Sequence, residues 1–131
     1  MNLSFDSGIK EYTINGDPSR VIRINPSDFG IIERAEKAKA VLDNLSIDPG
    51  EEHYAEAVLS MDRAVREQID AIFGEGTSQT AFGDVNCVSL AGGSPIFLNF
   101  LNAILPEVEK AITAERKKSE ANIKKYTSRV K

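Results

Sequence analysis

The chain of 131 residues has little of the side-chain chemistry on which most enzymes and metal proteins depend. It contains one cysteine, Cys87, one histidine, His53, and no tryptophan. A single cysteine cannot form an internal disulfide, and one cysteine with one histidine is too few for the usual zinc site. We therefore expect no metal and no cofactor. We interpret Cys87 as a small buried or half-buried residue and His53 as a solvated residue at a helix start.

Long hydrophobic runs and catalytic motifs are also absent from the sequence. No apolar run approaches the roughly 20 residues that cross a bilayer, and residues 1–12 lack the basic region and apolar core of a secretory signal. The sequence has no nucleophile elbow, zinc-binding histidine pair, phosphate loop or dinucleotide-binding glycine motif. Hydrophobic residues make up 41% of the chain and charged residues 27%. This composition predicts a soluble protein with a single domain over residues 1–131. The missing motifs predict that it is not an enzyme.

Charge is distributed unevenly along the chain. Residues 110–131 contain eight Lys or Arg and two Glu, so they carry +6. Because the net charge is −4, the other 109 residues carry −10. An acidic body with a basic end can interact with itself, with an acidic partner or with nucleic acid. We interpret residues 113–131 as a basic C-terminal helix or tail. A nucleic-acid-binding segment is the alternative, which the shortage of interleaved aromatic residues disfavours.

The strongest periodic pattern lies in residues 51–73. Apolar residues recur there at steps of three and four positions, which is typical of one face of an α-helix: Tyr54, Val58, Met61, Val65, Ile69 and Ile72. Charged residues such as Asp62 and Arg66 lie between them, and we expect these to face solvent. Gly74 follows where a helix-terminating glycine belongs.

Residues 9–24 predict a β-hairpin. The runs 9–14 and 20–24 alternate between apolar and polar residues, and residues 15–19 separate them as a five-residue loop. A helix start follows, with Asn25 as its cap and Pro26 as its first residue. We expect this helix to bury one apolar face and to end at the turn made by Asp48, Pro49 and Gly50. That face consists of Phe29, Ile32, Ala35, Ala38, Leu42 and Leu45.

Residues 74–93 are rich in glycine and poor in charge, which predicts a long ordered loop, with or without short helical turns. Such a loop is either a binding surface or a connector that covers the core with Phe82. Ser94 and Pro95 then predict the cap and first residue of the last helix, which Pro106 should kink or restart. The predicted class is α+β, in which an N-terminal hairpin packs on a mainly helical domain of three to four helices, residues 25–112.

Four segments, in this order, carry a family pattern that spans most of the chain. They are Lys10-Glu-Tyr-Thr-Ile-Asn-Gly-Asp, the junction Ile24-Asn-Pro-Ser-Asp-Phe-Gly, Ile69-Asp-Ala-Ile-Phe-Gly-Glu-Gly with Ala81-Phe-Gly just after it, and Ser94-Pro-Ile-Phe-Leu-Asn-Phe-Leu-Asn-Ala-Ile-Leu-Pro. In order and size the chain resembles the small tail assembly chaperones of long-tailed bacteriophages and prophages.

The resemblance implies a non-catalytic protein of the bacterial host cytoplasm. It would bind the phage tape-measure protein, keep it soluble and help the tail-tube protein assemble around it. The family transfers no site residues, so we single out apolar side chains suited to a helix-binding groove: Phe73, Phe82, Phe97, Phe100 and Leu101. Their alternative role is in the domain core. A homo-oligomer could form through the same faces, and we expect no membrane partner.

Overall fold

The computed structural model describes residues 1–46, 48, 50 and 52–130. Along the chain the elements are β1 (Lys10–Ile14), β2 (Asp17–Ile24), α1 (Phe29–Asp43), α2 (Tyr54–Phe73), α3 (Thr77–Phe82), β3 (Leu90–Ala91), β4 (Ser94–Pro95) and α4 (Ile96–Val130). The predicted α+β class is confirmed. The predicted turn at Pro49 and helix start at Glu51 lie outside the described residues, as does Lys131 at the end of the basic segment.

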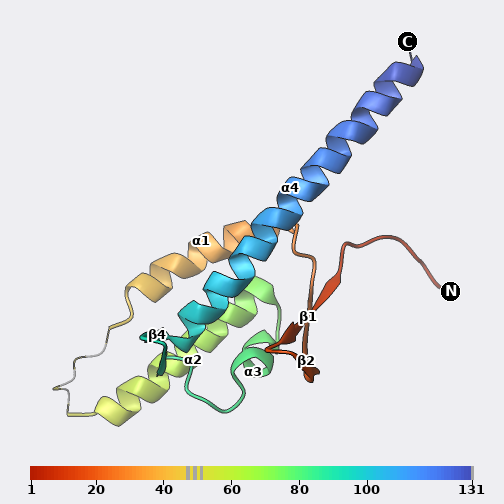
Figure 1. The fold of residues 1–131 in the computed structure, drawn as a ribbon. Helices are drawn as coiled ribbons and strands as arrows, with labels where there is room; N and C mark the ends of the chain where they lie inside the picture. Colours follow the sequence, from red (N-terminus) through yellow and green to blue (C-terminus); the bar gives the residue numbers. More distant parts are fainter. Residues whose placement is uncertain (47, 49, 51, 131) are drawn as a thin grey trace.

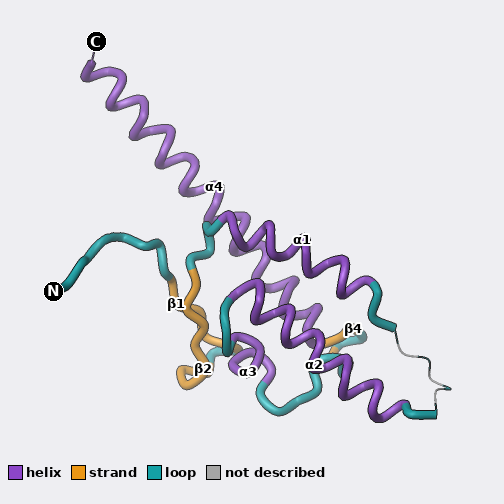
Figure 2. The backbone as a smooth tube through the Cα atoms, turned by 180° about the vertical axis from the view of Figure 1, so that it is seen from behind, coloured by secondary structure: helices purple, strands orange, loops and turns teal. Residues whose placement is uncertain are grey.

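The long helices α1, α2 and α4, the short helix α3 and the β1–β2 and β3–β4 hairpins make up the body of the molecule (Figure 1). The first half of α4 lies with α1 and α2, while its second half projects away from them. The β1–β2 hairpin lies next to α3, and residues 1–9 lead away from the body as an extended arm (Figures 1 and 2). Met1, Leu3 and Phe5 of this arm are exposed. Arg20 Nε joins the hairpin to α3 by donating to the carbonyl oxygen of Thr80 at 2.9 Å.

The hairpin turns more tightly than the sequence suggested. Its strands are antiparallel with Tyr12 opposite Ile22, and its turn consists of Asn15 and Gly16 alone, both with positive φ. The predicted five-residue loop was therefore wrong. Thr13 of β1 pairs with Val21, but the next residue, Ile14, pairs with Asp17, so the register shifts there. Pro18 lies between these two partners on β2, and such an irregularity tolerates a residue that cannot donate a ladder hydrogen bond.

Helix α1 starts later than predicted and differs from the predicted face at Phe29 and Ile32, which are exposed. The rest of that face is confirmed, because Ala38 is buried and Ala35, Leu42 and Leu45 pack against the core. Its cap is Asp28, whose carboxylate accepts a hydrogen bond from the Gly30 amide at 2.8 Å, rather than Asn25. Asn25 instead accepts hydrogen bonds from the Ser27 amide and hydroxyl. Ile31 is the buried residue of the first turn, while Phe29 is 74% exposed.

The core forms along α2, as its periodicity predicted. Val65 and Ile69 are fully buried and Ile72 nearly so, whereas Tyr54 at the start of the stripe is exposed. Phe73 of α2 also belongs to the core. The rest of the chain completes it with Ile22, Ile24, Ile31, Ala38, Phe82, Cys87, Ile104 and Val108. Gly74 ends α2 with a φ of 122°, as expected.

The segment before α4 contains more regular structure than the predicted loop. It includes α3 and a small hairpin, β3–β4, which turns at Gly92 and Gly93 with positive φ at both. Ser94 therefore lies in a strand and is not the cap of α4. The first amides of α4, those of Ile96 and Phe97, donate to the carbonyls of Ser89 and Cys87 at 2.9 Å each.

Helix α4 continues through Pro106, so of the predicted kink or restart, the restart does not occur. Val108 and Ala111 beyond it are buried. We attribute the continuity to this packing, which holds the helix on the core on both sides of the missing amide donor.

Candidate functional site

An open apolar groove of about 690 Å³ lies between α1 and α4. Its walls include Ile32, Ala35 and Leu42 from α1 and Phe97, Leu101 and Leu105 from α4. Ile72 of α2 contributes to the lining between them. Ala35 extends no farther than its Cβ atom, so the wall of α1 leaves space at its position. Helices α1 and α4 thus stand apart over α2, and apolar side chains line the space between them.

Two large apolar side chains at this groove are exposed to solvent. Ile32 of α1 is 47% exposed and Leu98 of α4 is 40% exposed. Charged groups line the groove as well, namely Glu36, Lys39 and Asp43 from α1 and Glu109 from α4. An exposed apolar strip with a polar rim is typical of grooves that bind an amphipathic helix.

The structure divides the five predicted partner-binding residues between the groove and the core. Phe97 and Leu101 line the groove. Phe73 and Phe82 are 7% and 5% exposed and belong to the core. Phe100 lies between them, with edge-to-face ring contacts of 5.7 Å to Phe73 and 5.6 Å to Phe82.

Sequence reasoning missed Ile32 and Leu98 as groove residues. The pattern placed Ile32 on the buried face of its helix and left Leu98 unassigned. The spacing of Leu98, Leu101 and Leu105 was a usable signal, because residues three and four positions apart lie on one side of a helix.

A second hollow, of about 770 Å³, lies between the β1–β2 hairpin, α3 and α4. Tyr12, Phe82 and Phe100 are among its lining residues. Partial burial and the negative charge of Glu107 raise the pKa of the Tyr12 hydroxyl. Over the described part of the chain, no group of three or more His, Cys, Asp or Glu side chains is placed to hold a metal ion.

Asp62 and Arg66 of α2 were predicted to face solvent, but both side chains are largely covered. They hold residues 83–88 against the helix. Asp62 Oδ1 accepts from the Cys87 amide at 2.8 Å and from Arg66 Nε at 3.0 Å. Arg66 Nη2 donates to the carbonyls of Gly83 at 2.8 Å and Val85 at 2.7 Å. Burial opposes ionisation of Asp62, but these hydrogen bonds and the charge of Arg66 outweigh it and lower its pKa. The cluster is a structural clamp, and we name it the Asp62 clamp.

Cys87 is fully buried beside this clamp. Burial, together with its contact to Asp62, raises the pKa of the thiol from 9.0 to about 12. Because the thiolate is the reactive form, we expect Cys87 to resist alkylation by iodoacetamide at pH 8 in the folded protein and to react fully in urea. Mass spectrometry of the labelled chain measures both. Rapid labelling under native conditions would contradict the buried placement of Cys87.

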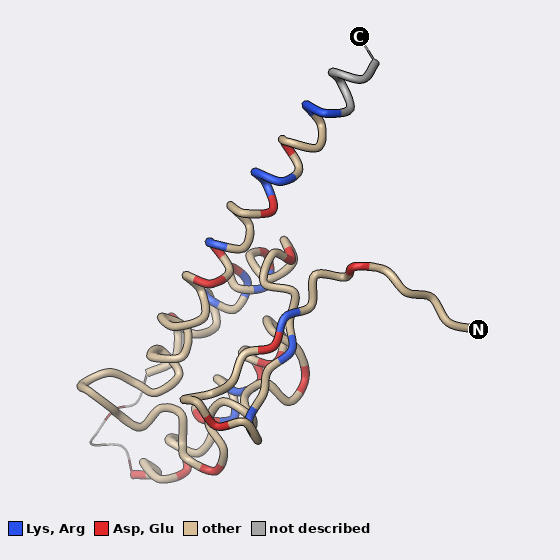
Figure 3. The backbone as a smooth tube through the Cα atoms, turned by 45° about the vertical axis from the view of Figure 1, so that its right-hand side comes forward, with Lys and Arg blue, Asp and Glu red and all other residues tan. Residues whose placement is uncertain are grey.

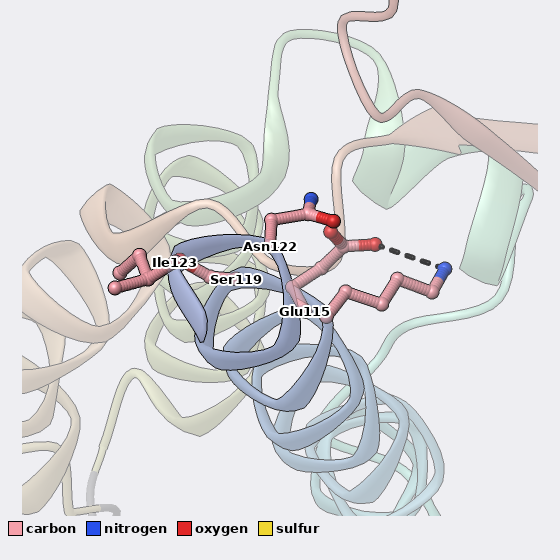
Figure 4. Close-up of a pocket in the computed structure, with 5 residues that line it drawn as sticks. Glu115, Ser119, Asn122 and Ile123 are labelled. Atoms are coloured by element: carbon pink, nitrogen blue, oxygen red, sulfur yellow. Dashed lines mark ion pairs between the residues drawn. The ribbon is translucent and has the colours of Figure 1, made fainter. Parts of the chain in front are cut away.

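The second half of α4 carries the basic residues into solvent (Figure 3). All described side chains from residue 113 to residue 125 are exposed. A shallow hollow here is lined by Glu115, Lys118, Ser119, Asn122 and Ile123, all from one helix, with Glu115 and Lys118 paired at 3.6 Å (Figure 4). A single helix cannot enclose a ligand, so we assign no small-molecule site to this hollow.

Comparison of this chain with family models, curated proteins and solved structures finds no match in any of the three. No helix in the described ranges is long and apolar enough to cross a membrane. The α1–α4 groove and the exposed basic half of α4 are the two surfaces on which the proposals below are based.

Proposed function

We propose that this chain is a non-catalytic phage tail assembly chaperone that holds amphipathic helices of the tape-measure protein in the α1–α4 groove. The observation that carries the proposal is the pair of exposed apolar side chains, Ile32 and Leu98, at a groove with charged residues along it. The sequence resemblance to tail assembly chaperones supplies the partner.

A groove of this kind suits a chaperone for physical reasons. A long helical partner exposes apolar stripes until it is assembled, and these stripes drive aggregation. Covering one stripe with the groove removes apolar surface from water, while the charged rim keeps the complex hydrated. The tail-tube protein could then replace the chaperone along the same stripe.

Co-expression with the tape-measure protein encoded near this chain's own gene tests the proposal. We expect the tape-measure protein to aggregate when expressed alone and to elute with this chain as one complex in size-exclusion chromatography with light scattering. A tape-measure protein that stays insoluble while this chain elutes alone would overturn the proposal.

A second candidate is a nucleic-acid-binding accessory protein, which the exposed basic half of α4 favours. Phosphate contacts by Lys and Arg release counterions, so such binding should weaken steeply as salt is added. It should also disappear when residues 113–131 are removed. Binding that is absent or insensitive to salt would reject this candidate.

A further inference from the structure

The α1–α4 groove has an acidic rim. Its charged lining residues are Glu36, Asp43 and Glu109 against a single base, Lys39, which gives a net charge of −2. The groove follows α1 from Ile31 to Asp43, which corresponds to a helix length of about 18 Å. A helix that fits this groove should therefore carry basic residues beside an apolar contact and should be at least this long.

The projecting half of α4, residues 113–130, carries basic residues beside an exposed apolar side chain. Between residues 113 and 125 it carries five basic and two acidic residues, a net charge of +3. Within the described part of the chain, Lys117, Lys124 and Lys125 make no ion pair. Ile123 on the same segment is 62% exposed. Residues 113–130 form about 26 Å of helix, which is longer than the groove.

The chain's own α4 cannot fill its own groove. The first half of α4 is one wall of that groove, and the second half continues from it away from the body (Figure 1). Pairing two projecting halves with each other would bring like charges together, which is unfavourable. The acidic groove of a second copy offers opposite charge and an apolar contact to the same helix.

We propose that the projecting half of α4 of one copy docks in the α1–α4 groove of a second copy, with its lysines against Glu36, Asp43 and Glu109. The contact joins two different surfaces, so it links copies head to tail and closes into a ring or continues as a chain. The inference shares the groove with the proposed function but does not depend on the tape-measure protein. It adds regulation, because a tape-measure helix would have to displace the docked α4.

Light scattering of the full chain after size-exclusion chromatography tests this proposal. We expect oligomers that grow with protein concentration at about 50 mM NaCl and dissociate at about 500 mM, because salt screens contacts between exposed charges. A single-chain mass at every salt and protein concentration would overturn the proposal, whether or not the tape-measure protein binds.

Two charge-reversal variants locate the contact. Lys124→Glu with Lys125→Glu removes the net positive charge of the projecting half of α4. Glu36→Lys with Asp43→Lys removes the net negative charge of the groove. Each pair should raise the dissociation constant of self-association at least tenfold, while an equimolar mixture of the two variants should associate again, since each retains the surface that the other has lost.

Glu52→Lys with Glu56→Lys, in and just before the exposed first turn of α2, is the matched control and should leave association unchanged. Oligomers that persist in either groove or helix variant would refute the contact. Salt-sensitive binding of duplex DNA by a chain that stays monomeric would assign the basic helix to nucleic acid instead.

Discussion

Replacing Asp62 with alanine is expected to lower the free energy of unfolding by about 3 kcal/mol. The carboxylate accepts hydrogen bonds from the Cys87 amide and from Arg66. Its removal leaves a buried amide and a largely covered guanidinium without their acceptor, and such groups are costly in the interior. Urea denaturation followed by circular dichroism measures the change.

Glu67→Ala is the matched control for this substitution, because Glu67 is an exposed carboxylate on the same helix. It should change the free energy of unfolding by no more than about 0.5 kcal/mol. If Asp62→Ala costs less than about 1 kcal/mol, the Asp62 clamp contributes less to stability than its geometry indicates.

The same clamp makes stability depend on pH. Because folding lowers the pKa of Asp62 below its usual value of 3.8, its contribution is complete above that value and is lost as the pH falls through the lower, folded value. The stability difference between the parent chain and Asp62→Ala should therefore shrink in strong acid. A constant difference between neutral pH and about pH 2 would show that the charged form of Asp62 is not what stabilises the fold.

Glutamate at both Ile32 and Leu98 is expected to weaken binding of the tape-measure protein about 100-fold, equivalent to about 2.7 kcal/mol. A helix seated in the groove would lay its apolar side over two carboxylates, and covering charged groups with apolar side chains is costly. Both positions are well exposed in the free chain, at 47% and 40%, so the folded state should tolerate the change. Co-elution with the tape-measure protein, followed by titration calorimetry, measures the effect.

Leu59→Glu is the control for the groove variant. Leu59 is a large apolar residue on α2, 62% exposed and not part of the groove lining. It should leave binding unchanged. If the Leu59 and groove variants lose binding equally, the partner does not use the α1–α4 groove.

The elements of the fold could be predicted where apolar periodicity reports burial directly. The stripe through Val65, Ile69 and Ile72 identified the core helix because a helix of this length must bury such a face. The same reasoning failed for Asp62 and Arg66. Their acceptors and donors are backbone groups of residues 83–88, and no local pattern indicates that a loop returns to cover a charged face.

The candidate site was predictable only in part, for a related reason. Phe97 and Leu101 follow the apolar side of α4, and the structure places both in the groove. Phe73 and Phe82 have the same hydrophobicity but are buried. A sequence gives the apolar side of each helix, whereas a groove depends on where two helices stand relative to each other.

Helix α4 is continuous, but its two halves should differ in the free energy needed to open them. Its first half opens only when the core opens, because Ile104, Val108 and Ala111 are buried. In its second half, every described side chain from residue 113 to residue 125 is exposed, so this half can fray while the core remains intact. Local opening of the helix should thus cost little beyond Ile112 and nearly the full unfolding free energy before it.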